Sequence, residues 1–314
     1  MKIKVFILFI LFFPVIYSCR KSKCPVPTTS TTENNLMPTS LSGYLLAVDF
    51  PTPTTGYISG NNGAVYKTTD GGQTYQNICP LSGYDYYSLD FVSATTGYLV
   101  NSYSTDKGNV YKTTDGGQNW VLLSVPTTQW RCVKFINTQV GFVGGGVVND
   151  SNYNGNLYRT ADGGNTWTQI VISNLKSVTG IYFVDANIGH MSCDEGQVYV
   201  TSDGGQTWTL QNLNLNTTLP TTQLITGDIF FKNANEGYCL TRTVYYNDMF
   251  LMKTMDGGNN WSRIALPASG FTTSNSYVCI AFADNNTGYI SGGNITEDKG
   301  VILKSTDGGS TWFQ

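Results

Sequence analysis

The eight residues from Thr68 to Tyr75 read TTDGGQTY, and the same pattern returns five more times along the chain. The later copies are Thr113 to Trp120 (TTDGGQNW), Thr160 to Trp167 (TADGGNTW), Thr201 to Trp208 (TSDGGQTW), Thr254 to Trp261 (TMDGGNNW) and Ser305 to Trp312 (STDGGSTW). The steps between successive aspartates are 45, 47, 41, 53 and 51 residues, for Asp70, Asp115, Asp162, Asp203, Asp256 and Asp307. Steps of this length fit one four-stranded propeller blade per repeat.

A second pattern runs in phase with the first: a Phe, five residues, a Gly and then usually an aromatic residue. The pairs are Phe50/Gly56, Phe91/Gly97, Phe135/Gly141, Phe183/Gly189, Phe231/Gly237 and Phe282/Gly288. A branched aliphatic residue stands two positions before each Phe, and this period of two predicts a strand with one buried face. Each repeat therefore predicts four strands: one ending at the Phe, one beginning at the Gly, one entering the TTDGG turn and one leaving it.

The fold that follows is all-β, a single β-propeller with six four-stranded blades. Seven blades with one degenerate copy is the alternative. The last repeat stops at Gln314, too early for a complete fourth strand. Residues 34–38 resemble the segment that follows the first repeat, so we expect them to complete the last blade and close the ring.

The eight-residue pattern resembles the Asp-box, or BNR, repeat, in the form S/T-x-D-x-G-x-x-W. Every copy matches except that Tyr75 replaces Trp in the first, and the copies span residues 44–314. The resemblance implies that the six aspartates are structural, on the turn between the third and fourth strands and away from the ligand side. The turn chemistry agrees, because Asp accepts N–H bonds within its own turn and Gly permits a positive φ.

The first residues predict export. Lys2 and Lys4 precede an apolar run over residues 5–17, and Ser18-Cys19 follows, as in a loose lipobox in which Tyr17 departs from the strict form. We therefore divide the chain into a lipoprotein signal peptide (1–18), a Pro/Thr/Ser-rich tether acylated on Cys19 (19–42) and the propeller (43–314). An ordinary signal peptide with an incidental Cys19 is the alternative. The expected location is the outer membrane or cell surface, with a lipid anchor as the membrane contact.

Composition narrows the function classes. Charged residues make up 12% of the chain against about 25% in typical domains, and the net charge of −3 gives no reason to expect nucleic acid as a partner. The chain has one His and no C-x-x-C pair, so no metal site is predicted. We expect no cofactor.

Catalysis has weak support. Sialidases of the Asp-box type use a cluster of three arginines and an Arg-Ile-Pro-like motif. The folded part has only Arg131, Arg159, Arg242 and Arg263, and it has no such motif. A glycosidase needs two carboxyls across a cleft, and outside the Asp-boxes Asp85, Asp90, Asp194, Glu195 and Asp228 are the candidates, with no visible pairing. His190 stands where the other repeats have Tyr or Phe, so it is interpreted as a packing substitute.

The predicted ligand surface lies where the first strands begin. Trp130 is the one tryptophan outside the Asp-boxes; it lies five residues before Phe135, with Arg131 beside it, and Tyr86 and Tyr277 hold the equivalent positions. Aromatic residues with an arginine are typical of recognition patches. The candidate binding residues are therefore Tyr86, Trp130, Arg131, Asp228 and Tyr277. The alternative is that the aromatic residues cap the core.

The spacing of the two patterns is also similar to the propellers of photosystem II assembly factors, which implies a non-enzymatic scaffold with an arginine-rich client patch. This chain has few arginines and a lipoprotein-like leader, so only the idea of a binding platform carries over. We expect a monomeric, envelope-anchored propeller that binds a protein or a glycan. A carbohydrate-active hydrolase of the Asp-box propeller type is the alternative.

Overall fold

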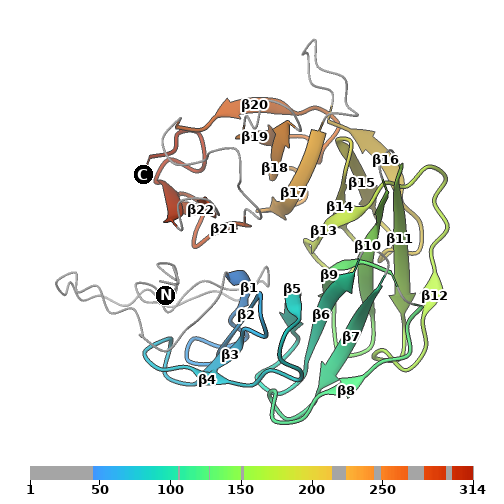
Figure 1. Ribbon diagram of the computed structural model, residues 1–314. Helices are drawn as coiled ribbons and strands as arrows, with labels where there is room; N and C mark the ends of the chain where they lie inside the picture. Colours follow the sequence, from blue (N-terminus) through green and yellow to red (C-terminus); the bar gives the residue numbers. More distant parts are fainter. Residues whose placement is uncertain are drawn as a thin grey trace.

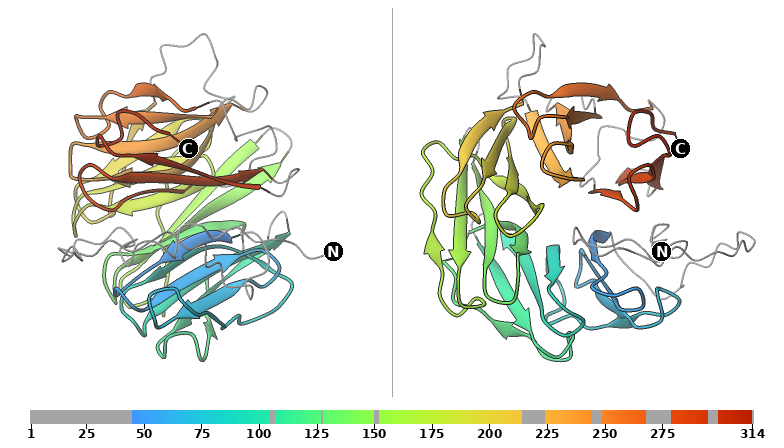
Figure 2. Two further views of the ribbon diagram at one scale, coloured as in Figure 1. Left: turned by 90° about the vertical axis from the view of Figure 1, so that its left-hand side faces the viewer. Right: turned by 180° about the vertical axis from the view of Figure 1, so that it is seen from behind.

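The computed structural model describes residues 45–104, 107–126, 128–149, 152–213, 224–243, 249–267, 279–294 and 299–313. All regular elements in these ranges are strands, and no described helix could span a membrane. The strands form six sheets that follow one another around a common axis, seen along that axis in Figure 1 and from the side and behind in Figure 2. The six-bladed propeller predicted from the repeats is confirmed.

The first strand of each blade lies nearest the axis (Figure 1). These inner strands are β1 (Leu45–Asp49), β5 (Asp85–Phe91), β9 (Trp130–Phe135), β13 (Val178–Phe183), β17 (Leu224–Phe231) and β21 (Cys279–Phe282). The second strands all begin at the predicted Gly: β2 (Gly56–Gly60), β6 (Gly97–Ser104), β10 (Gly141–Asn149), β14 (Gly189–Cys193), β18 (Gly237–Thr243) and β22 (Gly288–Asn294).

The third strands run into the Asp-boxes: β3 (Val65–Thr68), β7 (Lys107–Thr113), β11 (Asn152–Thr160), β15 (Gln197–Thr201), β19 (Met249–Thr254) and β23 (Lys299–Ser305). The outermost strands are short: β4 (Gln76–Asn77), β8 (Val121–Leu122), β12 (Thr168–Gln169), β16 (Thr209–Asn212) and β20 (Ser262–Ala265). Five sheets therefore have four strands and the sixth, β21-β22-β23, has three.

The sixth blade is partly completed by the end of the chain. The N–H of Phe313 donates to the carbonyl of Lys304 at 3.0 Å, and the N–H of Lys304 donates to the carbonyl of Phe313 at 2.7 Å. This bridge places Phe313 where the other blades have a fourth strand. The predicted closing segment, residues 34–38, lies outside the described residues, as do the predicted signal peptide (1–18), the predicted tether (19–42) and Cys19.

The Asp-box turns have one hydrogen-bond pattern. In the third copy, Asp162 accepts from the hydroxyl of Thr160 at 2.8 Å and from the N–H and hydroxyl of Thr166 at 2.9 and 2.6 Å. These bonds to Thr166 and Thr160 lower the pKa of Asp162 to about 2. The two glycines that follow have φ values of 70° and 93°, a region that a side chain disfavours. The aspartates thus hold the turns.

Aromatic rings join consecutive blades. Tyr98 in β6 lies flat against Phe135 of the next blade, with ring centroids 3.4 Å apart, and the Trp167 indole packs edge-on against the same ring at 6.1 Å. Equivalent stacks join Tyr57 to Phe91, Phe142 to Phe183, His190 to Phe231 and Tyr238 to Phe282. The core is therefore divided among the seams between blades, which agrees with packing as the role predicted for His190.

Buried carboxylates satisfy N–H groups of the inner strands. Asp90 accepts from the backbone N–H of Phe135 at 2.7 Å and from the Lys134 ammonium at 2.6 Å. Asp49 accepts from the N–H of Phe91 in the same way. These bonds cross from one blade to the next, so Asp90 serves the architecture rather than a carboxyl pair for hydrolysis.

Candidate functional site at the mouth face

The end of the ring where first strands begin and second strands end is called the mouth face here. Five inner strands carry a register irregularity at this end, at the same point of the repeat. In β9 the pairing passes from Trp130 to Cys132, which leaves Arg131 as the extra residue. The equivalent bulge residues are Leu46, Tyr87, Thr179 and, in β17, Gly227 with Asp228.

The bulges decide which side chains reach solvent. Tyr86 and Trp130, each one residue before the bulge, have exposed fractions of 0%, whereas Tyr87 and Arg131 are half-buried. An extra residue in one strand re-aims the local side chains. The ring of residues at the mouth is therefore displaced by one position from the ring that the sequence suggested.

Arg131 forms the central ion pair of the site. Its guanidinium donates from Nη1 to Oδ2 of Asp194 at 3.2 Å, with side-chain exposures of 30% for Arg131 and 2% for Asp194. Asp194 lies in the turn after β14, so the pair joins blades three and four. Desolvation raises the pKa of Asp194 to about 6, opposed by Arg131 and Arg242. The buried Asp194 carboxylate therefore holds the Arg131 guanidinium in a place where part of it is exposed to solvent.

A second ion pair lies at the same end of the sheet as the first. The Lys176 ammonium is 2.9 Å from Oε1 of Glu195, which follows Asp194 in the turn. Glu195 has a φ of 60°, and its N–H donates to the carbonyl of Leu224 at 2.9 Å, at the start of blade five. These contacts hold the charged turn against both neighbouring blades.

The other predicted residues have structural surroundings. The hydroxyl of Tyr86 donates to the carbonyl of Leu81 at 2.9 Å, and Trp130 packs edge-on against Tyr158 at 5.8 Å. Asp228 accepts from the N–H groups of Ile229 and Ile280 at 3.0 and 3.2 Å, so it joins blades five and six. The burial of Tyr86 and Trp130 favours the core-capping alternative for both. Tyr277 lies outside the described residues.

Sequence reasoning named Arg131 and named Asp194 as a carboxyl, but did not bring them together. The two are 63 positions apart, and the strands that contain them belong to different blades. Tyr87 and Thr179 were missed because a bulge leaves no clear residue pattern when the extra position holds Leu, Tyr, Arg or Thr. Gly227 is the one bulge residue whose type hints at an irregular strand.

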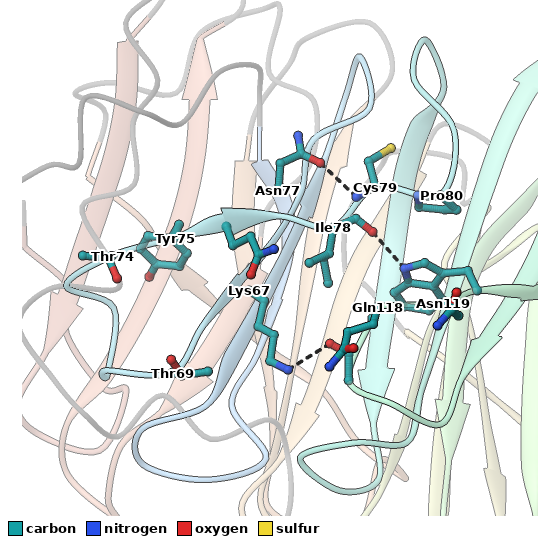
Figure 3. Close-up of a pocket in the computed structure, with 14 residues that line it drawn as sticks. Lys67, Thr69, Thr74, Tyr75, Asn77, Ile78, Cys79, Pro80, Gln118 and Asn119 are labelled. Atoms are coloured by element: carbon teal, nitrogen blue, oxygen red, sulfur yellow. Dashed lines mark hydrogen bonds between the residues drawn. The ribbon is translucent and has the colours of Figure 1, made fainter.

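A groove of about 740 Å³ lies elsewhere, between the outer part of blade one and the Asp-box of blade two (Figure 3). The Lys67 ammonium in its wall donates to the carbonyl of Gly116 at 3.0 Å, and the Trp120 indole N–H donates to the carbonyl of Ile78 at 2.9 Å. The Cys79 thiol donates to the carbonyl of Leu81. These polar groups already bind one another, so the groove offers a ligand less than the mouth face does.

Comparison with known proteins supports the family resemblance. Residues 79–217 match the family model described as Photosynthesis system II assembly factor YCF48. No curated protein matches the chain. The resemblance to assembly-factor propellers, inferred from the repeat spacing, is confirmed by this match.

Solved structures share the fold. A structure described as YCF48 bound to D1 peptide is 20% identical with a TM-score of 0.60, over 88% of this chain and 81% of that one. YCF48 from Cyanidioschyzon merolae is 18% identical with a TM-score of 0.61, over 87% and 85%. The GH74 xyloglucanase from Xanthomonas campestris is 15% identical with a TM-score of 0.57, over 83% of this chain and 43% of the enzyme. At these identities the likeness establishes the propeller fold.

Proposed function

We propose that the chain is a non-catalytic, envelope-anchored propeller that binds a protein or glycan partner through its mouth face. The observation that carries the proposal is the half-buried Arg131 guanidinium supported by the buried Asp194 carboxylate. An arginine held by a carboxylate loses little conformational entropy on binding and retains further N–H donors for a ligand. A peptide partner has the better support, because the similar YCF48 propeller is described as bound to a peptide.

Hydrolysis has less support from the same residues. Asp194 has the raised pKa of about 6 that suits a general acid, but its side chain is 2% exposed and already bound by Arg131. Glu195 is paired with Lys176, and Asp90 and Asp228 bind backbone N–H groups. The described carboxyls of the inner strands and of this turn are thus engaged in holding the blades.

The test is affinity capture from the native cell envelope, with the full chain as bait. A double variant, Arg131→Gln with Asp194→Asn, removes both charges together and so avoids leaving one buried charge without its partner. We expect a partner that wild type retains and the double variant loses. The matched control is Gln118→Ala, an exposed substitution on an Asp-box turn at the opposite end of the blade.

If wild type and the double variant retain the partner equally and have equal melting temperatures, the partner binds at a surface that does not include Arg131. A parallel assay for hydrolysis of xyloglucan and related β-glucans tests the alternative function. Turnover that disappears in Asp194→Asn would favour the hydrolase. Retention of a partner without turnover supports the binding propeller.

A further inference from the structure

The five seams from blade one to blade six contain the same pair of backbone carbonyls, called the carbonyl cradle here. One belongs to the first Gly of an Asp-box and the other to the residue three positions after the inner-strand Phe. A Cβ placed on that Gly would lie 2.8 to 3.2 Å from the second carbonyl oxygen in all five seams. The pairs are Gly116/Ala94, Gly163/Thr138, Gly204/Ala186, Gly257/Ala234 and Gly308/Asn285.

In three seams a lysine ammonium occupies the cradle. Lys67 donates to the carbonyl of Gly116 at 3.0 Å and Lys112 to that of Gly163 at 2.7 Å. Lys232 donates to the carbonyls of Gly308 and Asn285 at 2.9 and 2.8 Å. A tyrosine hydroxyl donates alongside in each, from Tyr57, Tyr98 and Tyr238. The cradle is therefore a built acceptor site for a monovalent cationic group.

Among the described residues, the seam between blades four and five has neither a lysine ammonium nor a tyrosine hydroxyl at its cradle. His190 and Val200, which pair across β14 and β15, stand where blade one pairs Tyr57 with Lys67 and blade two pairs Tyr98 with Lys112. Among the described residues, the Ala234 carbonyl is alone within 4 Å of a Cβ placed on Gly257. At Gly116 the Lys67 ammonium and the Tyr57 hydroxyl lie within 3.0 Å of the same point.

The imidazole of His190 has the pose of the tyrosine rings. It stacks on Phe231 with centroids 3.4 Å apart and planes 8° apart, and Tyr98 stacks on Phe135 at 3.4 Å and 5°. An imidazole lacks the phenol oxygen that reaches the cradle in those seams. His190 is 1% exposed, and both of its nitrogens lack a hydrogen-bond partner among the described residues. A neutral imidazole therefore retains an unused acceptor nitrogen at this seam.

In the seam between blades three and four, the Ala186 carbonyl is likewise alone, among the described residues, within 4 Å of a Cβ placed on Gly204. That seam differs in its side chains, because Phe142 replaces the tyrosine and the Arg159 guanidinium lies 5.9 Å from the Phe142 ring centroid. At the seam of blades four and five, Gln211 Oε1 and Trp261 Nε1 are also buried without a partner among the described residues. Unpartnered buried polar atoms cost free energy unless a bound species satisfies them.

We propose that the carbonyl cradle between blades four and five binds a monovalent cation of ammonium or potassium size from solution. The carbonyls of Gly257 and Ala234 and a neutral nitrogen of His190 are its ligands, in the place of the lysine ammonium found in the other seams. Val200 is half-buried. The ion joins the two blades without a covalent tether, and this role is independent of the mouth face.

The experiment compares melting temperatures of the purified full chain in KCl, NH₄Cl and choline chloride at equal ionic strength. We expect potassium and ammonium to raise Tm by about 2–5 °C over choline, the shift for an ion at several times its Kd. In Val200→Lys the tethered ammonium fills the cradle, so Tm rises in choline and its dependence on potassium disappears. Val200→Met supplies a long apolar chain and is the matched control; it should not raise Tm in choline.

A direct readout is a crystal soaked in thallium(I), which replaces potassium. An anomalous peak beside the carbonyls of Gly257 and Ala234, absent from Val200→Lys, supports the proposal. Equal melting temperatures in all three salts, without a peak, would overturn it and leave water as the occupant.

Discussion

At the scale of single residues, the Phe of each repeat requires the Gly, because the Phe ring occupies the space that a side chain at the Gly position would need. Phe135 and Gly141 are cross-strand partners, and a Cβ on Gly141 would lie 2.4 Å from the Phe135 ring. The other five blades have the same contact at 2.3 to 2.6 Å. The ring lies directly over the backbone of the buried glycine, where it also meets the aromatic residue of the preceding blade.

This contact predicts the cost of a single methyl group. Gly141→Ala should destabilise the fold by about 1–3 kcal/mol, because the added carbon forces Phe135 out of its position. Urea unfolding monitored by tryptophan fluorescence measures the change. Phe135→Leu in the same background makes room for the methyl group, so the double variant should cost less than the two single costs added together; strict additivity would contradict the steric explanation.

At the scale of elements, the aromatic side chains that stabilise the fold are packed in the seams between blades. The last blade gives a simple example. Trp312 is 6% exposed and packs edge-on against Phe282 at 5.9 Å, whereas the side chain of Phe313 beside it is 46% exposed. One residue fills the seam, and the next contributes through its backbone bridge to Lys304.

Truncating the two side chains separates these roles. Trp312→Ala should cost about 3–5 kcal/mol, the usual price of removing a buried indole, while Phe313→Ala should change stability by under about 0.5 kcal/mol. Calorimetry of the two variants checks the difference. Similar losses for both would mean that the exposed Phe313 ring packs on something as closely as the indole does.

His190 makes its seam sensitive to acid. Burial lowers the pKa of His190 from 6.5 to about 3. Above pH 6.5 the His190 side chain is neutral in the folded and in the unfolded state. Below pH 6.5 the unfolded chain binds a proton at His190 and the folded chain does not. Stability is therefore lost as the pH falls, by about 1.4 kcal/mol per unit, until the folded pKa is reached.

His190→Tyr removes this term and restores the residue found in four other blades. The variant should match or exceed wild type at pH 7.5, and its advantage should grow by about 2 kcal/mol at pH 5. Denaturant unfolding at the two pH values measures this. An advantage that does not change with pH would mean that the folded state also protonates His190.

At the scale of the whole molecule, the mouth face combines charges from several blades. Arg131 comes from blade three, Asp194 and Glu195 from blade four, and Lys176 precedes the first strand of blade four. A site shared in this way depends on the angle between blades, so a folded ring is needed to assemble it.

Salt dependence offers a test of a charged binding surface. If the partner is held through Arg131, its apparent Kd should rise several-fold between 50 mM and 500 mM NaCl, because screening weakens exposed charge pairs. Titration calorimetry with the captured partner measures this, and the slope should flatten in the double variant at Arg131 and Asp194. A salt-independent Kd would indicate apolar recognition elsewhere.

The architecture can be predicted from the repeats alone. Six phased repeats of a turn and a Phe–Gly pair specify strand order, blade number and the structural role of the aspartates, because these are local patterns and one unit is copied along the chain. The starts of the second strands and the ends of five inner strands were predicted to the residue.

Which residues reach the mouth depends on contacts that form in the folded ring. A bulge moved the exposed position from Trp130 to Arg131, and the neighbouring turn supplied Asp194 as its partner. Bulge position and inter-blade contacts depend on how sheets twist against one another, which a period-two pattern in one strand does not encode. In the same way, His190 and Val200 replace the Tyr and Lys of other blades, but the sequence does not show that backbone carbonyls of the next blade lie beside them. The folded structure is needed to see this.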